Sequence, residues 1–182
     1  MGSLTKFDLN EFDCNIYVET GIGRCVSFNR ACLRYGQDKC FGVDLDFEFF
    51  NEARLKYPES NIVYGKSTKA LEIWLQGDRI QSNDRVLFFL DAHFPGADYR
   101  GRPYDPTAQD ALPLREELLL IKQFRSDCDD VIICDDARIY YQGDFANGNI
   151  SYRADHGIED VFTNRSLTID YRDEGYIIIK KK

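Results

Sequence analysis

The stretch Arg85-Val-Leu-Phe-Phe-Leu-Asp-Ala-His-Phe-Pro-Gly96 decides how the rest of this 182-residue chain is organised. Its apolar part, residues 86–90, is an unbroken hydrophobic run, which is typical of a strand buried on both faces of a parallel sheet. Asp91 and His93 follow this run directly. Because ligands of open α/β sheets bind beyond the carboxyl ends of the strands, these two side chains are candidates for a binding rim.

A second apolar run, Val131-Ile-Ile-Cys134, ends in the same way on Asp135 and Asp136. The carboxyl ends of parallel strands meet at one edge of a sheet, so both runs deliver polar side chains to the same place. We therefore expect three carboxylates and the imidazole of His93 to converge on one rim, which the remainder of the chain positions.

Composition restricts the class of protein. With 182 residues, 43% of them hydrophobic, the chain suits one domain (residues 1–182) with a substantial core. Its net charge of -8 argues against nucleic acid as a partner, because affinity for phosphate backbones comes from clustered lysine and arginine. No stretch approaches the roughly 20 apolar residues of a membrane span. No apolar signal region opens the sequence, so we expect an intracellular, cytoplasmic protein.

The cysteine pattern favours reduced thiols. No C-x-x-C pair occurs, and several of the cysteines lie in apolar segments. We expect buried free thiols rather than zinc ligands or disulfides. The six positions are Cys14, Cys25, Cys32, Cys40, Cys128 and Cys134.

Strand and helix patterns alternate along the chain, which predicts an α/β sandwich with a mainly parallel sheet. Expected strands cover residues 16–19, 39–44, 61–64, 86–90 and 131–134, and a C-terminal β-hairpin covers 167–171 and 176–179. Expected helices cover residues 25–35, 47–57, 68–76 and 113–124. In the last helix we expect the inward side chains to be Leu118, Leu119, Ile121 and Phe124.

A glycine turn, Glu19-Thr-Gly-Ile-Gly23, joins the first expected strand to the first helix. Glycines there let a ligand approach the backbone closely. Asp44 ends the next strand, where an acid can accept hydrogen bonds from both ribose hydroxyls. The pattern favours a nucleoside-containing cofactor over a tight turn and an ordinary exposed aspartate, although Val26 stands where a third glycine is usual.

The three acids Asp91, Asp135 and Asp136 form a candidate site for a hard divalent cation, which prefers oxygen ligands. The alternative is that one of the adjacent pair caps a helix or pairs with Arg138. His93 lies two residues after Asp91, on the same side of an extended chain, where it can serve as a general base or play a structural part.

These residues together resemble class I S-adenosylmethionine-dependent methyltransferases, and in particular a group of small bacterial and viral members. The shared motifs run in the same order from residue 16 to 140. They are the Val-Glu-Thr-Gly turn at Val18–Gly21, Leu-Asp-Ala-His at Leu90–His93, Pro-Leu-x-x-Glu-Leu at Pro113–Leu118, and Asp-Asp-Ala-Arg at Asp135–Arg138. The resemblance implies the Rossmann-like class I methyltransferase sandwich.

The resemblance also implies roles at the cofactor. The glycine turn is expected to contact the methionine part of S-adenosylmethionine, and Asp44 to hold the ribose. Lys66 stands where the family usually has an acid near the adenine, so Ser67 is the residue expected to supply that contact. The full set of expected cofactor residues is Glu19, Thr20, Gly21, Gly23, Asp44, Ser67 and Asp91.

The acid constellation is further similar to metal-dependent sugar O-methyltransferases. By that resemblance Asp91, Asp135 and Asp136 hold Mg²⁺ or Mn²⁺, and His93 is the base. Viral relatives of this size methylate hydroxyls of capsid glycans, rhamnose among them. The resulting hypothesis is methyl transfer to a sugar hydroxyl of a carbohydrate acceptor, with residues 94–111 as the acceptor cover through Tyr99, Arg100, Arg102 and Tyr104.

Other functions remain open at this point. A catechol or phenol O-methyltransferase ranks second among enzymes, because a more apolar cover would suit a phenol. A non-catalytic cofactor-binding module of a larger glycan enzyme and a nicotinamide-dependent oxidoreductase are the remaining alternatives. The sequence leaves the acceptor, the choice of metal and the oligomeric state undecided, with a homo-oligomer among the partners considered.

Overall fold

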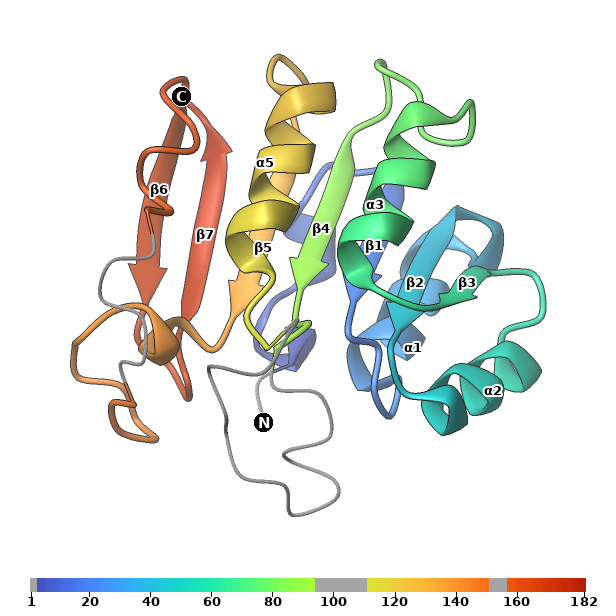
Figure 1. Cartoon of the computed structure of the whole chain (residues 1–182), viewed down its shortest axis with the longest axis horizontal. Coiled ribbons are helices and arrows are strands. Elements are labelled where there is room, and N and C mark those ends of the chain that lie inside the picture. The colour runs from blue at the N-terminus through green and yellow to red at the C-terminus, as the bar shows by residue number, and fades with distance from the viewer. Residues whose placement is uncertain (1–2, 94–110, 151–156) are drawn as a thin grey trace.

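A computed structural model describes residues 3–93, 111–150 and 157–182 of the chain. They form a seven-stranded sheet with the strand order β3-β2-β1-β4-β5-β7-β6 (Figure 1). The first five strands pair in parallel, whereas β7 is antiparallel to both β5 and β6. This arrangement confirms the predicted α/β class, the mainly parallel sheet and the C-terminal hairpin.

Element bounds lie within a few residues of the predicted ranges. The strands are β1 Ile16–Thr20, β2 Cys40–Asp44, β3 Asn61–Tyr64, β4 Val86–Leu90, β5 Val131–Asp135, β6 Arg165–Asp170 and β7 Tyr176–Lys181. The α-helices are α1 Val26–Tyr35, α2 Phe47–Lys56, α3 Ser67–Gln76 and α5 Leu114–Arg125. Short 3₁₀ helices are η1 Leu4–Lys6, η2 Leu9–Glu11, η3 Gln37–Lys39 and η4 Ala137–Ile139.

The sheet has an apolar layer on each face. Helices α3 and α5 cover the face that is in front in Figure 1, and α1 and α2 pack with the other. Alternate residues of β4 point to opposite layers, with Phe88 in one and Phe89 in the other, both fully buried. A strand buried on both faces must be apolar throughout, which explains the continuous hydrophobic run in the sequence.

Helix α5 corrects one expected inward residue. Leu118 and Ile121 are fully buried as predicted, but Leu119 is 37% exposed. One residue turns a helix by about 100°, so the neighbour of a central inward residue points to the side of the stripe. The inward stripe instead continues through Glu117 and Arg125, two charged residues that a hydrophobic pattern does not identify.

An ion pair anchors the opposite end of the sheet from the candidate rim. The Asp130 carboxylate is fully buried, accepts a hydrogen bond from the Val86 N–H (2.9 Å), and pairs with Arg125 (2.8 Å). The Arg165 guanidinium donates to the Asp130 carbonyl (2.9 Å). These contacts tie the start of β4, the start of β5 and strand β6 together, which fixes how far each strand reaches toward the rim.

All six cysteines are free thiols, as predicted, and four of them are buried. None of the helices within the described ranges is long and apolar enough to cross a membrane.

Candidate active site

The glycine turn after β1 packs directly on the end of β4. Gly21 has φ +73°, and a Cβ atom placed there would lie 2.5 Å from the Asp91 carbonyl oxygen. The Asp91 N–H donates to the Thr20 carbonyl (3.0 Å), so the two strand ends stay in contact up to this point. Only glycine has both the backbone freedom and the small volume that this approach needs.

The same turn is also joined to the end of β2. The Asp44 carboxylate accepts hydrogen bonds from the backbone N–H groups of Gly23 (2.8 Å) and Asp46 (2.7 Å). Burial raises the pKa of Asp44, and these two hydrogen bonds oppose the effect. The residues predicted to hold the two halves of a nucleoside cofactor are therefore neighbours in space.

Glu19 is the acidic residue of the turn, and only 2% of its surface is exposed. It accepts a hydrogen bond from the Tyr17 hydroxyl (2.7 Å), two residues earlier on the same face of β1. Burial raises the pKa of Glu19 well above its usual range, although the Tyr17 hydroxyl acts in the other direction. A carboxyl group in this state has a strong tendency to acquire either a proton or a cationic partner.

His93 lies between two carboxylates at the ends of β4 and β5. Its Nδ1 is 3.4 Å from Asp91 Oδ1 and its Nε2 is 3.2 Å from Asp136 Oδ2. The second oxygen of Asp136 accepts from Arg138 Nε at 2.7 Å. Burial works to raise the pKa of Asp136, but His93 and then Arg138 outweigh it and lower the pKa below its ordinary value.

The remaining two acids of the rim behave in the opposite way. Burial, and next the charge of Asp135, raise the pKa of Asp91 well above its usual range. Burial also raises the pKa of Asp135 to about 6, and its Oδ1 atom is buried without a hydrogen-bond partner. Carboxylates placed this close together disfavour full ionisation unless a proton or cation intervenes. The three predicted acids and the imidazole thus form one electrostatically coupled group.

The chemistry of this group suits a hard divalent cation, since three carboxylates supply oxygen ligands and one Asp135 oxygen is unpartnered. The side chains of this group in this structure, however, are not arranged around a common metal position. Within the ranges that the structure describes, no three or more histidine, cysteine, aspartate or glutamate side chains are spaced as metal ligands. His93 occupies the space between Asp91 and Asp136.

Glu117 is a site residue that the sequence interpretation missed. Helix α5 carries it to the rim, where it is 1% exposed and one carboxyl oxygen has no hydrogen-bond partner. Burial raises its pKa to about 7, and the neighbouring Ser67 and Thr20 hydroxyls oppose the shift. The sequence did contain a signal for this residue, because Glu117 is a glutamate within the mainly apolar inward face of its helix.

Ser67, expected near the adenine, begins α3 and is 8% exposed beside Glu117. Of the expected acceptor cover at residues 94–111, the part with its tyrosines and arginines, residues 94–110, lies outside the described residues.

Comparison with known proteins identifies the fold. No family model matches the chain, and no curated protein matches its sequence. Among solved structures, a methyltransferase from Geobacter sulfurreducens superposes with a TM-score of 0.56 at 15% identity, covering 92% of this chain and 71% of the other. An S-adenosylhomocysteine-bound methyltransferase from Podospora anserina gives 0.55 at 14% identity, with 92% and 72% covered.

A putative caffeoyl-CoA O-methyltransferase from Staphylococcus aureus also gives a TM-score of 0.55, at 13% identity, with 93% of this chain and 77% of the other covered. At such low identities the likeness concerns the fold, which is the Rossmann-like sandwich of class I methyltransferases. The functional assignment has to come from the site itself.

Proposed function

We propose that this chain is an S-adenosylmethionine-dependent O-methyltransferase that methylates a sugar hydroxyl, with His93 as general base and a divalent cation held by Asp91, Asp135 and Asp136. The observation that carries the proposal is the meeting of two groups at the same strand ends. The glycine turn bonded to Asp44 lies beside β4, and the histidine–carboxylate group begins where β4 ends. The methyltransferase fold supports it further.

The cofactor end of the site uses the residues around the turn. Glu19, Gly21 and Gly23 line the methionine part, where the absence of side chains at the glycines lets the ligand reach the backbone. The Asp44 carboxylate accepts hydrogen bonds from the ribose, and Ser67 lies toward the adenine. The bound cofactor supplies an electrophilic methyl group on a positively charged sulfonium, which an acidic rim favours.

The acceptor end centres on His93. As the acceptor hydroxyl oxygen bonds to the methyl carbon, the pair of electrons of the carbon–sulfur bond stays on sulfur. The hydroxyl proton passes to one ring nitrogen of His93, where the acceptor hydroxyl replaces the carboxylate that faces this nitrogen in the structure. The carboxylate at the other nitrogen, from the pair Asp91 (3.4 Å) and Asp136 (3.2 Å), then stabilises the imidazolium. A divalent cation on the three carboxylates would lower the pKa of the acceptor hydroxyl. The unpartnered Asp135 oxygen and the oxygen donor set support this part of the proposal.

The choice of a sugar as acceptor rests on the resemblance of the acid motifs to sugar O-methyltransferases. Because that is an analogy, the assay has to compare acceptor classes directly. A phenol is the natural second class, since one structural neighbour is named as a caffeoyl-CoA O-methyltransferase.

The decisive experiment is calorimetric titration with S-adenosylhomocysteine, with and without Mg²⁺, followed by methyl transfer to a panel of deoxysugar glycosides and phenols. We expect binding of the cofactor product and cation-stimulated transfer to a glycoside. Transfer to phenols alone would overturn the acceptor class. Undiminished transfer in the presence of a chelator would overturn the metal, and absence of binding would overturn the methyltransferase itself.

The base is tested with His93→Ala, with His156→Ala as the control at the chain's other histidine. We expect kcat of the first variant to fall by about 10²–10⁴-fold, the usual contribution of general base catalysis. Its affinity for S-adenosylhomocysteine should equal that of the unmodified protein. A fully active His93→Ala variant would remove His93 as the base.

A further inference from the structure

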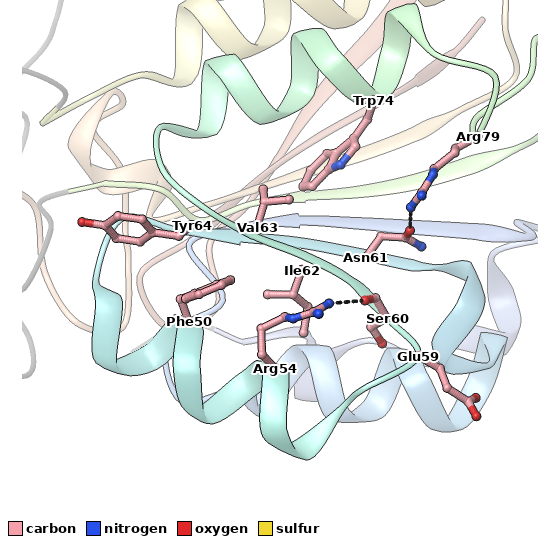
Figure 2. Close-up of a pocket in the computed structure, with 10 residues that line it drawn as sticks. All are labelled: Phe50, Arg54, Glu59, Ser60, Asn61, Ile62, Val63, Tyr64, Trp74 and Arg79. Carbon is pink, nitrogen blue, oxygen red and sulfur yellow. Dashed lines mark hydrogen bonds between the residues drawn. The ribbon is translucent and has the colours of Figure 1, made fainter.

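A groove runs along strand β3, at the free edge of the sheet (Figure 2). Its volume is about 600 Å³, and helices α2 and α3 with the segment after α3 supply its walls. The lining residues are Phe50, Arg54, Glu59, Ser60, Asn61, Ile62, Val63, Tyr64, Trp74 and Arg79. A groove centred on an edge strand places open backbone groups at its floor.

The direction of the backbone groups of β3 follows from a neighbouring bond. The Gly65 N–H donates to the Asp44 carbonyl on β2 (2.9 Å), and alternate residues of a strand point their N–H and C=O groups to opposite sides. Asn61 and Val63 therefore face β2, whereas Ile62 and Tyr64 direct two N–H and two C=O groups outward. Proline and lysine, two common protections of an edge strand, do not occur among residues 61–64.

The preceding outward residue, Ser60, is already satisfied within the chain. Its N–H donates to the Tyr57 carbonyl (3.1 Å), and its carbonyl accepts from Arg54 Nη1 (3.4 Å). With respect to the residues that the structure describes, the open part of the edge is thus limited to the four backbone groups of Ile62 and Tyr64.

The α2 side of the groove has two chemically different ends. At the Tyr64 end, three rings form an exposed aromatic cluster, with Tyr64 5.5 Å from Phe47 and 5.8 Å from Phe50 between centroids. Tyr64 and Phe47 are 55% and 56% exposed. At the Ser60 end lies the guanidinium of Arg54, which forms no ion pair with any residue that the structure describes.

We infer that this groove is the interface of a symmetric dimer in which β3 pairs with β3 of a second copy, in antiparallel orientation. A two-fold axis at Val63 sets Ile62 of each copy opposite Tyr64 of the other. That register forms four backbone hydrogen bonds and uses every open group of the edge. An axis at Ile62 would instead place Tyr64 opposite Ser60. The Ser60 N–H already donates to Tyr57, so the register with the axis at Ile62 forms fewer hydrogen bonds.

A second copy fits the side chains as well as the backbone. The two-fold axis makes the two β3 strands run in opposite directions. The aromatic cluster of each copy therefore meets Arg54 of the other copy. A guanidinium over aromatic rings is a favourable pair, strengthened when the interface excludes water. This self-complementarity is what an isologous interface requires. The result is one continuous sheet through both molecules, with both free β3 edges covered.

Sedimentation velocity over a range of protein concentrations tests the dimer, together with hydrogen exchange of the amide protons. We expect a species of about twice the 21.1 kDa chain mass. We also expect the Ile62 and Tyr64 amide protons to be protected at high concentration and to lose that protection on dilution. Tyr64→Pro removes an N–H group that donates between the two copies, so this variant should be a monomer. Its fold should be retained, because the outward N–H is not used within the chain.

Two further variants separate the interface from the fold. Tyr64→Lys keeps the N–H but adds a charge to the edge, and should also give a monomer. Tyr171→Ala, at an exposed tyrosine near the opposite edge, should remain dimeric. A wild-type monomer at all concentrations would overturn the inference. A dimer unaffected by both Tyr64 variants, or without concentration-dependent protection of β3, would do the same. Each readout is independent of methyltransferase activity.

Discussion

Replacing Gly21 by alanine tests whether the contact between β1 and β4 determines the candidate site. The glycine has φ +73°, and its added Cβ would lie 2.5 Å from the Asp91 carbonyl oxygen and 2.8 Å from the carbonyl carbon. Both are backbone atoms, so no side chain can move to relieve the clash. The end of β4 has to shift, and Asp91 shifts with it.

The expected cost has two parts. A non-glycine residue in the left-handed region loses roughly 1–2 kcal/mol. Forcing an extra methyl group into a packed position typically costs about 1–3 kcal/mol more. The free energy of unfolding should therefore fall by roughly 2–5 kcal/mol, which at a urea m-value of about 2 kcal/mol/M lowers the midpoint by roughly 1–2.5 M.

Gly148→Ala is the matched control. Gly148 has nearly the same φ, +77°, but nothing lies within 4 Å of the position of its Cβ. It carries the conformational part of the cost without the clash, so its unfolding free energy should fall by only about 1–2 kcal/mol. If urea titration shows Gly21→Ala to be no more destabilising than Gly148→Ala, the close approach of β4 is not what requires this glycine.

Two other substitutions have defined outcomes. The pKa of Glu117 is about 7 in the folded protein against an ordinary 4.5, so the folded state holds a proton that the unfolded chain has released between these values. Stability should fall by roughly 3 kcal/mol as pH rises through that window. Asp91, Asp135 and Glu19, whose pKa values are also raised, add to the same slope. Glu117→Gln should therefore reduce, rather than abolish, the loss of stability between about pH 5 and pH 7 in urea titrations, and an unchanged loss would assign it to the other groups. Asp130→Asn leaves two buried guanidinium groups without their counter-charge and should cost about 3–5 kcal/mol. In the control Asp129→Asn, which breaks only an exposed pair with Arg85, the loss should be at most about 1 kcal/mol. Equal losses in the two variants, measured by urea unfolding, would contradict the importance of the buried group.

The class of fold and the edge of the sheet that carries the polar groups could both be predicted from the amino-acid sequence alone. Strands such as β4 are buried on both faces, so every residue in them is apolar and the pattern is legible without a structure. The glycine turn and the acids at strand ends were equally legible, since each is a local feature of a strand and the residues that follow it.

How these groups meet depends on the three-dimensional arrangement of the strands and helices. Periodicity sets which residues of one element share a face, but the spacing of side chains from different elements depends on strand order, register and helix rotation. That is why the position of His93 between Asp91 and Asp136 and the unpartnered oxygen of Asp135 could not be predicted from the sequence. Glu117 belongs to the Pro-Leu-x-x-Glu-Leu motif, but only the rotation of α5 shows that its side chain reaches the rim. The prediction that Leu119 points inward was wrong for the same reason, because an error of one residue in helix rotation turns a side chain by about 100°.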